Sequence, residues 1–250
     1  NWTSVTFGGG VFVAVADGDG NFPFTTSGGD QVITSTSDDL IFNMGSRVMT
    51  SYDGLTWTLR TAPVYAWSSV TYGNNLFVAV ANGNGGSTQV MTSSNGITWT
   101  LRSTPFSQSN HNWRSVVYGD GTYVAVASGG SGTLNKAMYS TDGITWTAAV
   151  TPGTPAGCVS VTFGKDRFVA VANTSASAVL SAMTSTNGQT WTAVTTPNSA
   201  WTSVTYGNAT FTAVGNSGVA ANSVMVSTDG ESWTKYSAAN GNAWSSVAFG

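Results

Sequence analysis

Acidic side chains gather in one stretch of this sequence. Residues 17–46 hold five of the eleven Asp and Glu residues, namely Asp17, Asp19, Asp30, Asp38 and Asp39. A calcium loop begins with oxygen ligands at alternate positions, and Asp17, Asp19 and Asn21 have that spacing. The twelfth position of such a loop would be Gly28, where a bidentate Glu is needed. We therefore expect a solvated acidic loop with no metal or other cofactor, and keep calcium binding as the weaker alternative.

Residues that could support acid–base or nucleophilic catalysis are few and scattered. His111 is the only histidine and Cys158 the only cysteine, and neither lies in a nucleophile motif. Glu231 is the only glutamate, whereas glycoside hydrolysis needs two carboxyl groups that face each other across a cleft. We expect no catalytic residues and no enzymatic activity, and a glycoside hydrolase is the least favoured alternative.

The composition excludes several classes of partner. Charged residues make up 8% of the chain, and eight Lys and Arg against eleven Asp and Glu give a net charge of −3. So few cations cannot neutralise a phosphate backbone, which argues against nucleic-acid binding. No apolar run approaches the roughly 20 residues of a membrane helix, so we expect no membrane insertion. The single cysteine excludes an intrachain disulfide framework.

An internal repeat must position all of these residues. The segment WTSVTFGGGVFVAVA at 2–16 returns in similar form at 67–81, 113–127, 158–172 and 201–215. Each copy is followed by a second block, of which VMTSYDGLTWT is the first example, and the turns of these blocks lie 42, 47, 45 and 42 residues apart. A period in this range is typical of propellers, solenoids and arrays.

Four short β-rich runs separated by tight turns fill each repeat, and no run has helical periodicity. The second run is apolar on both faces, as expected when sheets stack face to face as propeller blades. We predict one all-β domain over 1–250, a five-bladed β-propeller of four-stranded antiparallel blades, with part of a six- or seven-bladed ring as the alternative. The expected repeats are 2–66 (with an insertion at 17–46), 67–112, 113–157, 158–200 and 201–242.

A sixth copy of the first strand, AWSSVAFG at 243–250, follows the fifth repeat. It could close the ring in place of 2–8, or it could be donated to a neighbouring molecule and so build a homo-oligomer or filament. The third explanation is a ring with more blades. We favour a closed five-bladed ring because closure removes exposed sheet edges.

The second block, S-x-(D/N)-G-x-(T/S)-W, resembles the Asp-box (BNR) repeat of sialidase-like propellers, although it is one residue shorter. In that family the box is the hairpin between the third and fourth strands, its Asp bonds to amides of the turn, and its Trp packs beneath. The resemblance gives this structural role to Asp53 and Trp57, Asn95 and Trp99, Asp142 and Trp146, Asn187 and Trp191, and Asp229 and Trp233. Asn at two of the five places suits a turn but not a metal ligand or an acid, so the boxes indicate no catalysis.

The resemblance implies the fold and not the sialidase activity. A sialidase would need convergent arginines, an acid, and a Tyr nucleophile with a Glu partner. Here Glu231 lies inside a box turn, and the five arginines fall at places in the repeat that do not converge. The repeats are also similar to those of uncharacterised marine phage and bacterial proteins presumed to be surface or tail-fibre modules. That similarity implies an extracellular, cell-surface or virion-surface location.

The insertion at 17–46 is the main candidate for a functional site. In propellers such a loop between the second and third strands shares a face with the segments between blades, and function is commonly grafted onto loops. We expect a non-enzymatic binding or adhesion module that recognises a glycan or a protein receptor. Candidate contacts are the acids of the insertion together with Tyr65, Asn110, His111 and Asn112. The alternative is a structural subunit of a fibre or appendage that assembles by donating the strand 243–250.

Overall fold

The computed structural model describes residues 1–18, 47–83, 87–106, 111–129, 136–153, 157–173, 180–216 and 223–249. These residues form twenty strands in five four-stranded antiparallel sheets. Among them, no helix is long and apolar enough to cross a membrane. The predicted all-β architecture with five four-stranded blades is confirmed.

The first blade contains β1 (Trp2–Gly8), β2 (Val11–Ala16), β3 (Val48–Ser51) and β4 (Thr58–Arg60). The second contains β5 (Ala66–Gly73), β6 (Leu76–Asn82), β7 (Val90–Ser93) and β8 (Thr100–Arg102). The third contains β9 (Trp113–Gly119), β10 (Thr122–Ala127), β11 (Ala137–Ser140) and β12 (Thr147–Ala148). The fourth contains β13 (Ser160–Gly164), β14 (Arg167–Val171), β15 (Leu180–Ser185) and β16 (Thr192–Thr195). The fifth contains β17 (Trp201–Gly207), β18 (Thr210–Gly215), β19 (Val224–Ser227) and β20 (Thr234–Tyr236).

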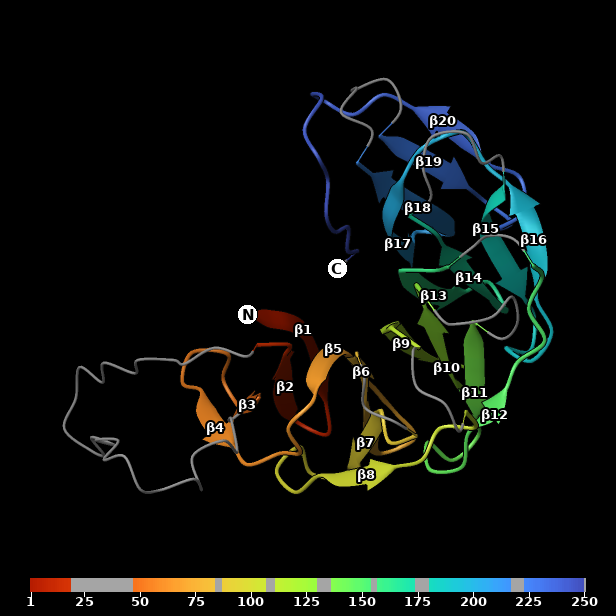
Figure 1. The fold of residues 1–250 in the computed structure, drawn as a ribbon. Helices are drawn as coiled ribbons and strands as arrows, with labels where there is room; N and C mark the ends of the chain where they lie inside the picture. Colours follow the sequence, from red (N-terminus) through yellow and green to blue (C-terminus); the bar gives the residue numbers. More distant parts are fainter. Residues whose placement is uncertain are drawn as a thin grey trace.

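The blades are arranged as an arc around a central axis, with the first strand of each blade innermost (Figure 1). Within a blade every strand pairs with its neighbour in sequence. The turns between the first two strands are tight, and in the second blade they place Asn74 and Asn75 at φ values of 43° and 59°. Two successive residues of positive φ are typical of the hairpin turn that matches the twist of the strands, and Asn tolerates it well.

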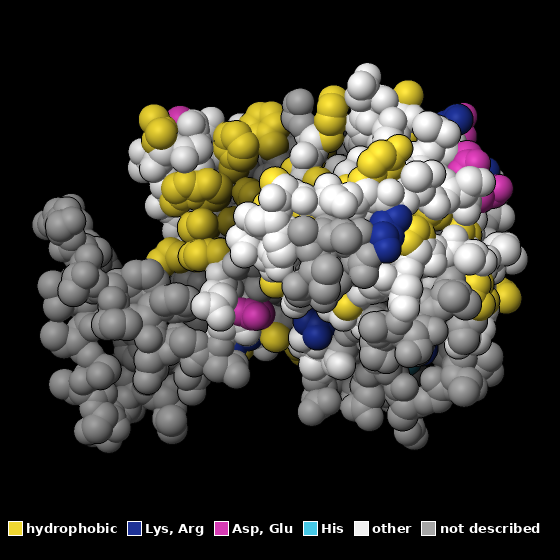
Figure 2. Space-filling view, turned by 90° about the horizontal axis from the view of Figure 1, so that it is seen from above, with side chains coloured by type: hydrophobic (Ala, Val, Ile, Leu, Met, Phe, Trp, Pro, Cys, Tyr) yellow, Lys and Arg dark blue, Asp and Glu magenta, His cyan; other side chains and the backbone are white. Residues whose placement is uncertain are grey.

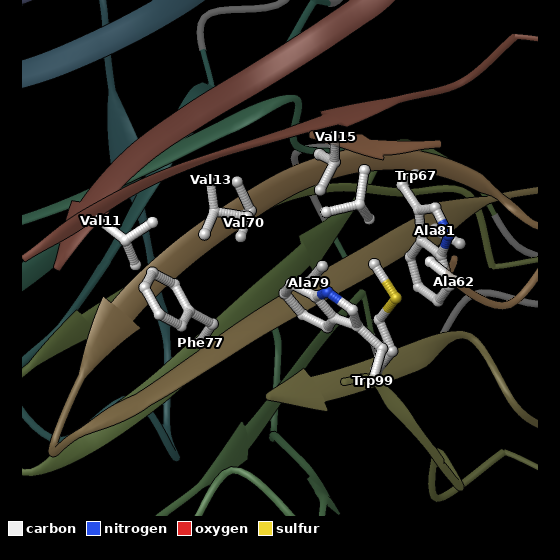
Figure 3. Packing of buried hydrophobic residues seen from close by; sticks show 12 residues of the cluster. Val11, Val13, Val15, Ala62, Trp67, Val70, Phe77, Ala79, Ala81 and Trp99 are labelled. Atoms are coloured by element: carbon white, nitrogen blue, oxygen red, sulfur yellow. The ribbon is translucent and has the colours of Figure 1, made fainter. Parts of the chain in front are cut away.

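Apolar side chains fill the space between neighbouring blades. In Figure 3, Val13 and Val15 of β2 lie against Phe77 and Ala79 of β6, and all four side chains are fully buried. Similar clusters join the second blade to the third, the third to the fourth and the fourth to the fifth. In the second, third and fourth blades the second strand packs against one neighbouring blade with each of its faces, so both faces carry apolar side chains.

A serine in each first strand also ties the blades together. Ser4 Oγ accepts a hydrogen bond of 3.1 Å from the amide of Val70 in the next blade. The same bond, 3.1 to 3.2 Å long, joins Val116 to Ser69, Val161 to Ser115, Val204 to Ser160, and Val247 to Ser203. The sequence analysis missed this contact, although the serine recurs at the same place in all six copies of the first strand.

The expected closure of the ring is not found among the described residues, and this expectation is corrected. Segment 243–249 lies beside β17, where Thr202 Oγ1 donates to the Trp244 carbonyl at 2.6 Å, just as Thr3 Oγ1 donates to the Trp67 carbonyl at 2.7 Å. β1 keeps its own ladder with β2. The first and fifth blades stand apart in Figure 1. The last segment therefore takes the place of the first strand of a sixth blade, because its side chains fit the outer side of β17.

Candidate functional site

The up-and-down path of each blade divides its connections between two ends. The connections between second and third strands and the segments between blades lie at one end, which we call the loop face. The turns between first and second strands and the box turns lie at the other end, which we call the box face. The box turns are 51–57, 93–99, 140–146, 185–191 and 227–233.

Two of the predicted contact residues, Tyr65 and His111, lie on the loop face, one at each junction of the second blade. The Tyr65 hydroxyl is 2.9 Å from Thr88 Oγ1, and the Tyr65 ring lies edge-on to Trp67 with centroids 5.6 Å apart. Beside Thr88, the buried side chain of Gln89 donates to the carbonyl of His111 at 3.0 Å. Residues 88 and 89 therefore connect Tyr65, at the junction of the first and second blades, to His111, at the junction of the second and third.

The imidazole of His111 belongs to an aromatic stack with Phe106 and Trp113. Its ring centroid lies 4.1 Å from that of Phe106 and 5.4 Å from that of Trp113, with interplanar angles of 24° and 12°. Trp113 is fully buried, whereas Phe106 and His111 are half-buried. We call these three residues the aromatic stack. The sequence analysis singled out His111 but missed Phe106, which belongs to the same segment between two blades.

Of the other predicted contacts that the structure describes, Asn112 adjoins His111 and Asp17 lies on the first blade. The carbonyl of Asn112 accepts a hydrogen bond of 2.9 Å from the amide of Ser128, at the end of the third blade's second strand. Asp17 lies on the first blade, 3.5 Å from the terminal ammonium of Asn1. The following predicted residues lie outside the described ranges: Asp19, Asn21, Asp30, Asp38, Asp39 and Asn110. Within the described ranges, no three His, Cys, Asp or Glu residues are grouped so that they could hold a metal ion.

Each box turn is held by a side-chain oxygen that accepts two backbone N–H groups. In the first blade, Asp53 Oδ1 accepts from the amides of Leu55 and Thr56, both at 2.8 Å. Ser51 Oγ donates to the same carboxylate at 2.9 Å and accepts from the amide of Gly54 at 2.8 Å. These bonds satisfy the amides of a turn that has no other backbone partner for them, which is the usual role of Asp in tight turns.

Asparagine holds the turn in the same way. Asn95 Oδ1 accepts from the amides of Ile97 and Thr98 at 2.8 and 3.0 Å. Trp99 Nε1 then donates to the carbonyl of Gly96 at 3.0 Å, and its ring is buried 6.4 Å from that of Phe77. The turn needs an acceptor oxygen and no negative charge.

The amide bonds lower the pKa values of the three Asp residues in the boxes. Hydrogen bonds from the amides of Thr56 and Leu55 lower the pKa of Asp53 to about 2. The corresponding amides lower the pKa of Asp229. At Asp142, burial raises the pKa, but the amide and Ser140 hydrogen bonds outweigh it and the net shift is downward.

These shifts predict a defined loss of stability in acid. Because the folded-state pKa lies below the unfolded value of roughly 3.9, each carboxylate stabilises the fold above about pH 4 and loses that contribution as the pH falls toward about 2. The triple variant D53N/D142N/D229N should therefore unfold with a weaker dependence on pH between 4 and 2, and with a similar midpoint at pH 7. Urea unfolding followed by tryptophan fluorescence measures both.

The single variant D120N is the control for the removal of a charge, because Asp120 lies in a turn between first and second strands with φ of 45°. It should keep the pH dependence of the parent chain. A triple variant that remains as sensitive to acid as the parent would show that the box carboxylates do not cause the loss.

Two charged side chains on the box face pair with each other at the junction of the fourth and fifth blades. Arg167 of the fourth blade forms an ion pair with Glu231 of the fifth. Lys165 Nζ donates to the Thr228 carbonyl at 2.7 Å in the same place. Arg60 and Arg102 lie at the ends of β4 and β8, away from this ion pair. Arg60 Nε donates to Thr50 Oγ1 at 2.8 Å, and Arg102 forms the equivalent bond with Thr92. These guanidinium groups do not converge on one ligand.

The one thiol is also unsuited to nucleophilic chemistry. Cys158 stands where the other five copies of the first strand carry Trp, and it is 1% exposed. Burial raises the pKa of its thiol to about 12. The thiolate, which is the reactive form, is therefore scarce at neutral pH.

No protein-family model matches the sequence, and no curated protein sequence matches it either. Several solved structures share the fold. They include YCF48 bound to D1 peptide, with a TM-score of 0.57 and 15% identity over 93% of this chain and 67% of that one. The computationally designed Ika8 protein has a TM-score of 0.62 and 11% identity over 100% of this chain and 65% of that one.

A third similar structure is virginiamycin B lyase from Staphylococcus aureus, with a TM-score of 0.68 and 16% identity over 100% of this chain and 88% of that one. The chain thus spans about two thirds of the length of the YCF48 and Ika8 chains. At these identities the likeness is one of fold. The chain is therefore a β-propeller by architecture, with repeated four-stranded blades like those of these structures.

Proposed function

We propose that this chain is a non-enzymatic binding module that uses its loop face to hold a glycan or a protein receptor outside the cell or on a virion. The aromatic stack is the observation that carries this proposal. Two of its rings are half-buried, so each offers part of its surface to a ligand while its other side is packed. Sugar rings and receptor side chains bind readily to aromatic groups that are held in this way.

The stack is well suited to binding because its surroundings hold it rigidly. Gln89 donates to the backbone of His111, and the amide of Thr104 donates to the carbonyl of Ser87 at 2.6 Å. The loop of the second blade is thereby fastened to the segment that carries Phe106 and His111. A ligand that binds here loses little free energy to ordering the protein. Nearby hydroxyl and amide groups, including those of Thr88 and Asn112, can supply hydrogen bonds to a sugar.

The distribution of charge supports a binding role over catalysis. Glu231 and Arg167 pair on the box face, away from the stack. In this proposal the box turns, which are similar to Asp boxes, only hold the third and fourth strands of each blade together. The loop face is the part that binds the ligand. The similar YCF48 structure is described as bound to a peptide, and by analogy an extended segment of a protein receptor is the second class of ligand.

A glycan array together with a receptor pull-down tests this function. We expect the chain to bind a subset of glycans or one receptor, and H111A to weaken that binding tenfold or more. Phe106→Leu, which keeps the apolar bulk but removes the ring face, should weaken it similarly. Y52A is the matched control, because Tyr52 is 70% exposed on the box face and should not affect binding.

Two results would contradict the proposal. The first is the absence of both glycan and receptor binding by a chain shown by circular dichroism to be folded. The second is hydrolysis of a sialoside or another glycoside above the rate of a heat-denatured sample, which would revive the hydrolase alternative.

A further inference from the structure

The outer face of the first blade carries apolar side chains that the other blades bury. Trp2 is 41% exposed, whereas Trp67 at the same place in the second repeat is fully buried. Val5 is 59% exposed, against 5% for Val70, and Phe7 is 56% exposed. Figure 2 shows apolar side chains gathered at the left of the molecule, where the first blade lies in Figure 1. We call this surface the first end face.

Among the described residues, the outer face of the fifth blade is covered along its inner strand alone. Segment 243–249 lies over β17, with Val247 bonded to Ser203 at 3.2 Å and the Phe249 ring against Gly207. Farther out, Thr212 and Val226 are half-buried. The corresponding side chains of the first blade, Val13 and Thr50, are 0% and 2% exposed because the second blade covers them. We call this surface the second end face.

The two end faces match the two kinds of surface that pack together at each junction between blades. Each of the four internal clusters pairs a side rich in Val from one blade with a side of Phe or Tyr, Ala, Met and Trp from the next. The second end face presents the first kind of side, and the first end face presents the other. A blade of the same repeat inserted between them would therefore find a matching surface on both of its sides.

We propose that the open sector is occupied by further blades of this same repeat, joined to 243–249, in a ring of more than five blades. Segment 243–249 is then the innermost strand of the first of these blades. Its Val247–Ser203 hydrogen bond with β17 recurs at all four internal junctions, and its Thr202–Trp244 bond has counterparts at the first two. A second whole copy of the chain fits less well, because its β1 would need the place that 243–249 fills. The sector left open in Figure 1 is also smaller than the one that the five blades fill.

Extension of the chain tests this proposal directly. A copy of residues 74–112 added after residue 250 supplies the other three strands of a sixth blade, and a copy of 74–157 supplies a seventh blade as well. We expect at least one of the two extended chains to be monomeric by light scattering, with a higher thermal midpoint than the 250-residue chain. Lower binding of a dye specific for exposed apolar surface should accompany this.

The variant V5K shows whether the first end face has been covered. In the 250-residue chain it should leave the unfolding equilibrium nearly unchanged, because Val5 is exposed. In the extended chain that closes the ring it should shift that equilibrium toward the unfolded state by tenfold or more, because an amino group would be buried without a partner. I144K is the control: Ile144 is 44% exposed in the third blade, and its effect should be the same in all chains.

Three outcomes would overturn the proposal. In the first, neither extended chain folds as a stabilised monomer. In the second, V5K remains without effect in both extended chains although they fold. In the third, the 250-residue chain forms a dimer that V5K dissociates, which would show that the occupant of the first end face is a second copy.

Discussion

The variant G119A should lower the free energy of unfolding by about 3 kcal/mol, although it adds only one methyl group. A Cβ at residue 119 would lie 2.1 Å from the ring carbon Cγ of Phe163 in the next blade. That ring has little freedom to move, because its centroid lies 4.7 Å from that of Phe168. Urea unfolding followed by tryptophan fluorescence gives the change. The contact recurs at three other internal junctions, where Gly8, Gly73 and Gly164 lie under Tyr72, Tyr118 and Tyr206.

The variant G207A is the matched control for this prediction. A Cβ at residue 207 would lie 2.0 Å from Phe249, an equally close approach. Phe249, however, is 60% exposed and belongs to segment 243–249, which is not held by a strand on its other side. The segment can move away, so we expect a cost below about 1 kcal/mol. Equal costs for the two variants would show that 243–249 is held as firmly as an internal strand.

The strands and their grouping into blades could be predicted from the sequence because both depend on local patterns. The repeat period, the tight turns and the apolar character of segments such as 11–16 can each be recognised from the residues of the repeats themselves. Ring closure could not be predicted in this way. Segments 2–8 and 243–249 have nearly the same sequence, so their residues do not indicate which neighbour either one chooses. That choice depends on which side of a blade is open, and this is a property of the assembled fold.

The candidate site was predictable only in part, for a similar reason. Tyr65 and His111 stood out as polar aromatic residues in the segments between blades. Their connection through Thr88 and Gln89 could not be seen, because it depends on a loop of the second blade reaching the entry of the third. Phe106 was overlooked because one aromatic residue in a loop is unremarkable until its stacking partner is known. Whether the acids of 17–46 contribute stays a prediction, since nearly all of them lie outside the described residues.

The variant W67A should cost about 3 to 5 kcal/mol of unfolding free energy, the range for truncating a large buried aromatic side chain. Trp67 is fully buried between the first and second blades, and its Nε1 donates to the Pro63 carbonyl at 2.9 Å. Its removal would leave a cavity and take the donor from that carbonyl. The loss is measured by urea unfolding followed by circular dichroism, because the variant has lost one of the ten tryptophans that give the fluorescence signal.

The variant W2A removes the same side chain from the same place in the first repeat, where it is 41% exposed. No described blade covers this side of β1, so a large part of the side chain is already in water before unfolding and the cost should be roughly half that of W67A. The ratio of the two costs therefore measures how open the first end face is in solution. If W2A proves as costly as W67A in the 250-residue chain, the first end face is already covered there, and the five blades do not form the open arc of Figure 1.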